Sequence, residues 1–294
     1  MNRDTAKKAG AIFRKIRRQR QISTQQLAAG LLSVSSINKF ENGHAKLSFT
    51  ILAELSRRMN LRPDYFFQEI YKQEGSAYTI FLNKIKPIYE SNDLPTLKKI
   101  AQKKALEVAH NPDFDLIGQL VTLFSLIKGI DQQYSVDTKM IEKIASHLLA
   151  IEYWDPFEIS LFNNCLILFT SVMIKNLLKE ILYSLDGVEA SDRILSLLCN
   201  AADIFYRRKD YEAARKIMLK CETLFSDQTK LMIRFKLTFM KNLLSSSRKQ
   251  AVIDNNKLIE SLRMIGSNNL ASSYEVYMRK YDFPEKLSNT PKKS

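Results

Sequence analysis

The strongest constraint on the fold is a series of paired amphipathic segments that fills the chain after residue 75. The first segments of the pairs are expected to begin near Ser76, Asp113, Pro156, Ser191 and Thr229. The second segments are expected to begin near Leu94, Asp137, Met173, Asp210 and Arg248. The first segments start 37, 43, 35 and 38 residues apart, and a pair of this length cannot bury its apolar face without stacking on a neighbour. This spacing predicts a right-handed solenoid of helix pairs.

The whole chain is expected to be all-α. Only 8 Gly and 7 Pro interrupt its 294 residues, and Leu, Ile, Lys and Ala recur at the spacing of helix faces. A last helix from about Asn269 to Tyr281 is expected to cap the solenoid. The segment Asp210–Ala214 resembles the start of the second helix of a tetratricopeptide repeat, where a small Ala permits close packing. We therefore expect a domain of tetratricopeptide-like repeats over residues 76–287, followed by a flexible tail over residues 288–294.

Residues 1–68 have the pattern of a separate helical domain, joined to the repeats by a linker over residues 69–75. Five helices are expected, over about residues 6–19, 24–29, 34–42, 50–59 and from Pro63 onward. Ser23 and Gln26 have the spacing of a capping box, in which each side chain pairs a backbone N–H at a helix start. Ser33 can cap the third helix and Gly43 can end it. Two short helices joined by a tight turn are typical of a helix-turn-helix.

The positive charge of the chain is concentrated in this first domain. The formal net charge is +14, and residues 1–72 hold 14 Lys and Arg against 5 Asp and Glu, a net of +9. Because cationic side chains bind phosphates by releasing condensed counterions, a compact basic domain indicates a nucleic-acid partner. A basic surface can also serve solubility alone, so the charge by itself leaves both interpretations open.

Residues for other kinds of chemistry are missing from the sequence. Cys165, Cys199 and Cys221 lack metal-ligand spacing, and their odd number argues against a disulfide framework. The three His are isolated, and no Gly-rich phosphate loop or nucleophile motif occurs. No segment has the pattern of a signal peptide or a membrane span. We expect a cytoplasmic protein that is not an enzyme and has no cofactor, no metal and no membrane partner.

The segments Ile22–Ala28 and Ser33–Gly43 closely resemble the helix-turn-helix of phage repressors, the Xre or Cro type. This resemblance implies that Arg17 and Glu41 form a structural ion pair between the first and third helices. It also implies a set of exposed DNA-contacting positions in the second and third helices and the turn that follows. These positions are Thr24, Gln25, Val34, Ser35, Asn38, Lys39, Asn42 and Lys46. For each of them the alternative is a solvent-exposed helix face. Modules of this type bind palindromic sites as two-fold dimers, so a homodimer on double-stranded DNA is expected.

Over nearly its full length the chain resembles the Rgg/GadR/MutR regulators. The segments that carry this resemblance are Ser33–Gly43, Trp154–Asn164 and the repeats. Lys39 departs from the family pattern by replacing a common Arg, which changes the base contacts available, and Phe157 replaces a frequent Tyr. The resemblance implies control by a short secreted signalling peptide, as in quorum sensing, bound on the concave face of the repeats. It therefore implies that residues 76–287 form the ligand-sensing and dimerisation domain.

An extended peptide needs partners for its backbone amides, and each Asn side chain offers both a donor and an acceptor. The residues expected to bind the peptide are Asn164, Asn163, Asn200, Phe157 and Tyr206. Further apolar candidates are Leu123, Phe162 and Phe239. Each apolar side chain can instead belong to the core, and each Asn can instead make a structural hydrogen bond.

The sequence thus predicts a sequence-specific transcriptional regulator, a homodimer controlled by a short hydrophobic peptide, with RNA polymerase as a further candidate partner. An alternative is a DNA-binding scaffold whose repeats recruit a protein without any small ligand. A peptide that changes the melting temperature or the DNA affinity would favour the sensor over the scaffold.

Overall fold

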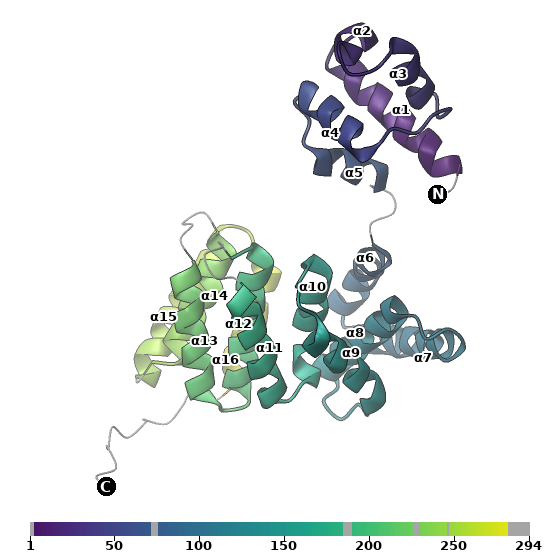
Figure 1. Ribbon diagram of the computed structural model, residues 1–294. Coiled ribbons are helices and arrows are strands. Elements are labelled where there is room, and N and C mark those ends of the chain that lie inside the picture. Colours follow the sequence, from purple (N-terminus) through teal and green to yellow (C-terminus); the bar gives the residue numbers. More distant parts are fainter. Residues whose placement is uncertain (1–2, 72–75, 185–189, 226–229, 246, 282–294) are drawn as a thin grey trace. The chain divides into compact units, whose positions relative to one another are not determined.

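The computed structural model describes residues 3–71, 76–184, 190–225, 230–245 and 247–281 (Figure 1). Within these ranges every regular element is helical and no strand occurs, which confirms the predicted all-α class. The chain divides into two compact units, an N-terminal unit over residues 1–84 and a C-terminal unit over residues 85–294. The division falls inside α6 (Ala77–Glu90). The expected tail and residues 72–75 of the expected linker lie outside the described residues.

Five helices precede α6 in the N-terminal unit. They are α1 (Arg3–Gln19), α2 (Thr24–Ala28), α3 (Val34–Glu41), α4 (Phe49–Arg58) and α5 (Pro63–Tyr71). Their apolar faces meet in one core, where Phe13 contacts Phe40 and Phe66 edge to face with ring centroids 5.3 and 5.8 Å apart. Ile37 is fully buried in the same core. These contacts hold α3 against α1 and leave its opposite face exposed.

Local hydrogen bonds set the ends of α2 and α3. The backbone N–H of Gln26 donates to Ser23 Oγ over 3.0 Å, and the backbone N–H of Ser23 donates to Gln26 Oε1 over 2.9 Å, which confirms the predicted capping box. Ser33 Oγ accepts a hydrogen bond from the backbone N–H of Ser36 and so begins α3. After α3 the backbone of Gly43 adopts a φ of 75°, the left-handed conformation that Gly tolerates best.

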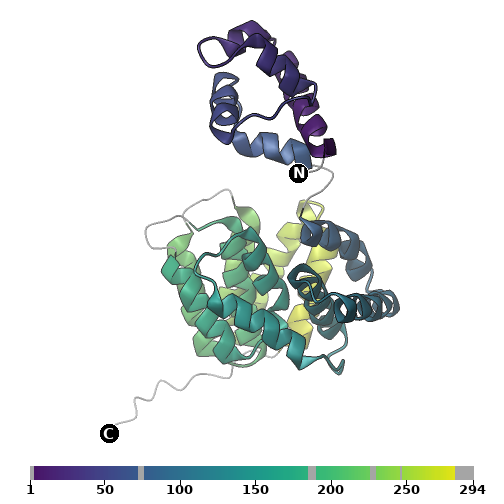
Figure 2. The same cartoon turned by 45° about the vertical axis from the view of Figure 1, so that its right-hand side comes forward.

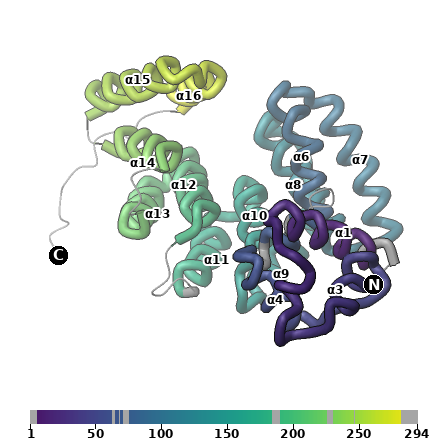
Figure 3. The backbone as a smooth tube through the Cα atoms, turned by 90° about the horizontal axis from the view of Figure 1, so that it is seen from above, coloured from purple at the N-terminus to yellow at the C-terminus, as the bar shows by residue number. Residues whose placement is uncertain are grey.

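Helix pairs build the C-terminal unit, as the spacing predicted. After α6 the helices are α7 (Leu94–His110), α8 (Phe114–Ile130), α9 (Thr138–Ala150), α10 (Pro156–Cys165), α11 (Ser171–Ser184), α12 (Asp192–Arg207), α13 (Tyr211–Leu224), α14 (Leu231–Leu243), α15 (Arg248–Met264) and α16 (Asn268–Lys280). From α7 to α9 and from α11 to α16, consecutive helices pack side by side, and the succession of helices can be followed in Figures 2 and 3. In addition, α8, α10, α12 and α14 contact one another in that order. The first helices of successive pairs therefore form a continuous row.

Aspartate side chains begin many of the helices in this unit. Asp93, Asp113, Asp137, Asp155 and Asp210 each accept a hydrogen bond from a backbone N–H two or three residues further on. Such a cap stabilises a helix by about 1 kcal/mol and involves only neighbouring residues. This is why the starts of these helices could be predicted from the sequence.

Candidate functional site

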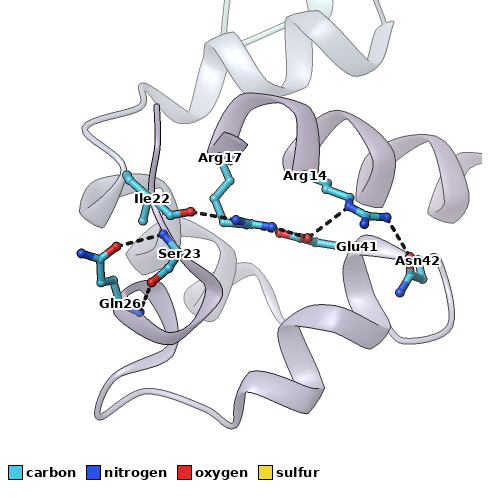
Figure 4. A network of polar contacts seen from close by, with 7 residues as sticks. All are labelled: Arg14, Arg17, Ile22, Ser23, Gln26, Glu41 and Asn42. Carbon is cyan, nitrogen blue, oxygen red and sulfur yellow. Dashed lines mark hydrogen bonds and ion pairs between the residues drawn. The ribbon is translucent and has the colours of Figure 1, made fainter. Parts of the chain in front are cut away.

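A buried ion pair joins α1 to α3 in the N-terminal unit (Figure 4). Arg17 Nε lies 2.5 Å from Glu41 Oε1 and its Nη2 lies 2.9 Å from Oε2, while Nη1 donates to the carbonyl of Ile22 over 2.7 Å. The side chains of Arg17 and Glu41 are buried, and their hydrogen bond raises the pKa of Arg17. The guanidinium uses its donors inside the protein. The structure thus contains the ion pair that the resemblance implied, and Arg17 is a buried link between α1 and α3.

Two more arginines serve the same scaffold. Arg20 donates to the carbonyls of Met59 and Asn60, which attaches the end of α1 to the end of α4. Arg58 donates to the carbonyls of Leu27 and Ala29 over 3.0 and 2.6 Å, which attaches α4 to the end of α2. Part of the positive charge of this unit is therefore structural, a distinction that counting charges in the sequence does not make.

The exposed face of α3 carries the residues expected to contact DNA. Val34 is 38% exposed, and Ser35, Asn38 and Lys39 are also exposed. Lys39 makes no ion pair with any residue that the structure describes. Of the remaining expected contacts, Gln25, Asn42 and Lys46 are exposed and Thr24 is half-buried. Asn42 Oδ1 accepts a hydrogen bond from Arg14 Nη1 over 3.2 Å, as Figure 4 shows.

A ladder of polar side chains crosses the row of first helices in the C-terminal unit. Asn163 of α10 accepts a hydrogen bond at Oδ1 from Asn200 Nδ2 over 2.9 Å. Asn200 of α12 in turn accepts at Oδ1 from Lys236 Nζ of α14 over 3.2 Å. Ser273 of α16 lines the same cavity as Asn200 and Lys236. We call Asn163, Asn200, Lys236 and Ser273 the polar ladder.

The polar ladder runs into a cavity of about 290 Å³ between α12, α14 and α16. The residues that line it are Cys199, Asn200, Asp203, Lys236, Phe239, Met240, Leu270, Ser273, Tyr274 and Tyr277. Tyr274 packs against Phe239 with ring centroids 4.7 Å apart. Burial and the neighbouring Asp203 carboxylate raise the pKa of Tyr277. Apolar walls with a few convergent polar groups are the composition of a ligand-binding cavity.

The residues expected to bind a peptide lie in different places in the structure. Asn163 and Asn200 come together in the polar ladder. Asn164 is half-buried on α10, and its carbonyl accepts a hydrogen bond from Ser125. Phe157 is half-buried against Phe114 at the other end of the same helix. Tyr206 is only 1% exposed and packs against Tyr211, so its ring is part of the core and not of the cavity.

The further apolar candidates for peptide binding also lie in different places. Leu123 and Phe162 are fully buried in the core, whereas Phe239 forms part of the cavity wall. Lys236, Asp203 and Ser273 were not among the expected residues. A signal for two of them was present, because the positions of the polar ladder are 37, 36 and 37 residues apart, which is the period of the repeats. Equal positions in successive first helices lie next to one another in a stack.

The start of α10, the helix that carries Asn163, holds two carboxyl groups that share a hydrogen bond. Asp155 caps the helix through bonds from the backbone N–H groups of Phe157 and Glu158. Burial, followed by the hydrogen bond with Asp155, raises the pKa of Glu158 to about 7. His147 Nε2 lies 3.7 Å from Glu158 Oε1, and burial lowers the pKa of His147.

Glu158→Gln is expected to stabilise the protein at pH 8 and to leave it nearly unchanged at pH 5. The folded state holds the Glu158 proton more tightly than the unfolded state, whose pKa is close to 4.5, so stability falls as pH rises from 4.5 to about 7. Removing that carboxyl should add about 1–3 kcal/mol at pH 8. Thermal unfolding of both proteins from pH 5 to pH 8 measures this. Since His147 is present in both, an equal pH dependence of the two would contradict the assignment to Glu158.

Within the described residues, no group of three or more His, Cys, Asp or Glu is arranged to hold a metal ion. In the same part of the chain, no helix combines the length and the apolar character needed to cross a membrane.

Each of the two units matches a known protein family. Residues 97–276 match the family model described as HTH-type transcriptional regulator Rgg, C-terminal domain, and residues 13–66 match the helix-turn-helix model. The chain belongs to the Rgg family. This confirms the resemblance that its sequence segments predicted, and the protein is an Rgg-type transcriptional regulator with an N-terminal DNA-binding helix-turn-helix.

Solved structures support the same fold for this Rgg-type regulator. The SHP pheromone receptor Rgg2 of Streptococcus dysgalactiae is 20% identical, with 92% of this chain and 99% of that chain covered and a TM-score of 0.75. A complex of PrgX with cCF10 is 16% identical, with 94% of this chain and 100% of that chain covered and a TM-score of 0.69. At these identities the likeness shows that the folds are shared.

Proposed function

We propose that this Rgg-type regulator binds palindromic double-stranded DNA as a homodimer and is controlled by a short hydrophobic peptide. The peptide binds along the polar ladder, with an apolar side chain in the adjoining cavity. In this proposal the protein acts in the cytoplasm and catalyses no reaction. The observation that carries the proposal is the polar ladder, which continues from Asn163 to Lys236 across three helices and meets the cavity wall. The pheromone receptor Rgg2 supports it by sharing the fold.

The spacing of the helices in the row of first helices suits an extended peptide. Packed helices are separated by about 8–10 Å, and an extended peptide advances about 3.3 Å per residue. Successive rungs therefore meet every third residue of a peptide that crosses the helices, and side chains between the rungs remain free to enter the cavity. Asn163 and Asn200 can exchange their mutual hydrogen bond for bonds to peptide amides without leaving either group unpaired. Asn164 and Phe157 of α10 extend the proposed site away from the cavity.

Asn200→Ala is expected to weaken peptide binding by about 1–3 kcal/mol, because the peptide amide then loses its partner. DNA binding without peptide should be unchanged. Calorimetric titration with a set of short apolar peptides measures the affinity, and Asn256→Ala, an exposed site on α15, is the matched control. A peptide that binds the Asn200 variant and the unaltered protein equally well would contradict the proposed site. If the C-terminal unit binds no peptide but binds another protein, the scaffold alternative would be favoured.

The DNA-binding surface is proposed to be the exposed face of α3, with Lys39 as a base-contacting residue. Lys39 is exposed and has no described ion-pair partner, so its ammonium group is available to a guanine. Asn38 and Val34 on the same face can contact adenine and a thymine methyl group. In this proposal Ser35, Thr24, Gln25, Asn42 and Lys46 position the module on the sugar-phosphate backbone.

Lys39→Ala is expected to weaken binding to a palindromic site, selected from random duplexes by the protein itself, by about 1–3 kcal/mol. The unfolding temperature should stay the same, because the side chain is exposed. Fluorescence anisotropy at several salt concentrations measures the affinity. Lys257→Ala, which removes an exposed charge from α15, is the control for general electrostatics. Equal losses in the two variants would mean that Lys39 does not contact the bases.

A further inference from the structure

The three cysteines of the chain are all buried, but their surroundings differ. Cys199 of α12 lines the cavity described above. Its Sγ lies 3.9 Å from the Sγ of Cys221, on the neighbouring α13. Cys165 of α10 has no thiol neighbour among the described residues and lies 4.0 Å from the hydroxyl of Thr122. One thiol of the chain thus faces a cavity and has a second thiol directly behind it.

The contact between Cys199 and Cys221 is a hydrogen bond between two reduced thiols, with the sulfurs 3.9 Å apart. A disulfide requires an S–S distance of about 2.05 Å, so the two sulfurs would have to approach by about 1.9 Å. The helices that carry them pack along their length. Side-chain rotation is the first movement available to close this distance, because the helices already lie next to each other.

Charges around the cavity distinguish the two thiols. Lys236, a rung of the polar ladder, lines the same cavity as Cys199. The hydrogen bond from the Cys221 thiol and the Lys236 ammonium group both lower the pKa of Cys199. The same hydrogen bond and burial raise the pKa of Cys221. Of the two thiols, Cys199 therefore loses its proton more readily, and the thiolate is the reactive form.

We propose that Cys199 is an oxidation site for small peroxides that enter the cavity, and that Cys221 resolves the oxidised product as an intramolecular disulfide. The Cys199 thiolate attacks one peroxide oxygen, the O–O bond breaks, and the departing hydroxide takes a proton to become water. The resulting sulfenic acid is attacked by Cys221, which releases a second water and forms the S–S bond. Two thiols are oxidised and one hydrogen peroxide is reduced to two waters.

The disulfide would change the cavity wall next to Asn200. A thiol that can donate and accept hydrogen bonds is replaced by an S–S bond directed toward α13. Oxidation therefore alters the surface that a ligand of this cavity meets. The chemistry at sulfur does not depend on the proposed peptide, so the two proposals can fail separately.

The test treats the full-length reduced protein with hydrogen peroxide and follows all three cysteines by mass spectrometry. We expect a linked Cys199–Cys221 peptide to form while Cys165 stays reduced, since Cys165 is fully buried and this burial raises its pKa to about 12. Cys165 is thus a reference thiol inside the same molecule. Oxidation of Cys165 at the rate of Cys199, or formation of links only between chains, would overturn the proposal.

Two variants separate the steps. In Cys221→Ser the sulfenic acid at Cys199 should persist and react with dimedone, and in Cys199→Ser neither remaining thiol should be oxidised. Lys236→Met keeps both thiols and should slow the alkylation of Cys199 by iodoacetamide at neutral pH, with the rate recovering at higher pH. This variant keeps the test valid if a cysteine variant does not fold. An alkylation rate at Cys199 that Lys236→Met leaves unchanged at every pH would contradict the role of the ammonium group.

Discussion

Replacing Gly10 with alanine is expected to abolish DNA binding and to lower the unfolding temperature of the N-terminal unit. A Cβ atom at Gly10 would lie 2.1 Å from the carbonyl oxygen of Phe40 and 3.0 Å from that of Glu41. Both obstacles are backbone atoms at the end of α3, so a side-chain rotation cannot relieve the clash. Only separation of α1 from α3 can do so, and that movement also draws Arg17 away from Glu41. We expect the free energy of unfolding of the N-terminal unit to fall by more than the roughly 1–3 kcal/mol typical of an overpacked core.

The control for this prediction is Gly129→Ala. Gly129 lies inside α8, and its Cβ would meet only the hydroxyl of Tyr89, at an ordinary 3.7 Å. Alanine is favoured over glycine inside a helix by about 1 kcal/mol, so this variant should be as stable as the unaltered protein or slightly more stable. Calorimetric unfolding and DNA binding measure both variants. If Gly10→Ala unfolds and binds DNA normally, the close approach of α1 to α3 does not limit the fold.

Glu41→Ala is expected to destabilise the N-terminal unit by about 3–5 kcal/mol, because it leaves a buried guanidinium without its carboxylate. Arg17 is 8% and Glu41 is 4% exposed, so water has little access to compensate for the lost carboxylate. The variant should lose DNA affinity in proportion to the unfolded fraction, and lower temperature should restore it. Urea unfolding of the full chain, followed through the first transition, measures the change.

A carboxylate in the same unit provides the matched comparison. Glu54 forms ion pairs with Arg57 and Arg58 at the surface of α4, where Arg57 is exposed and the other two side chains are half-buried. Ion pairs at the surface contribute little, because water solvates and screens their charges in the folded protein too. Glu54→Ala should therefore change the stability far less than Glu41→Ala. Equal effects would show that the burial of the Arg17–Glu41 pair does not matter.

Most of the secondary structure and the family could be predicted from the sequence. The caps at Ser23, Ser33 and the aspartates involve residues only two or three positions apart, so the neighbouring sequence contains the whole interaction. The helix pairs repeat at nearly constant length, which is also visible without a structure. The helix-turn-helix segment and the residues around Trp154 indicated the Rgg family, and the family models confirm it.

The tertiary structure decided which side chains meet across helices. The sequence could not show that Arg20 and Arg58 bind backbone carbonyls, that Tyr206 belongs to the core, or that Cys199 and Cys221 are in contact. Each of these facts depends on how one helix is rotated against another, and that rotation results from packing over the whole unit. Local sequence determined where each helix begins, because capping is short-ranged. Packing between distant segments determined the cavity, the polar ladder and the thiol pair.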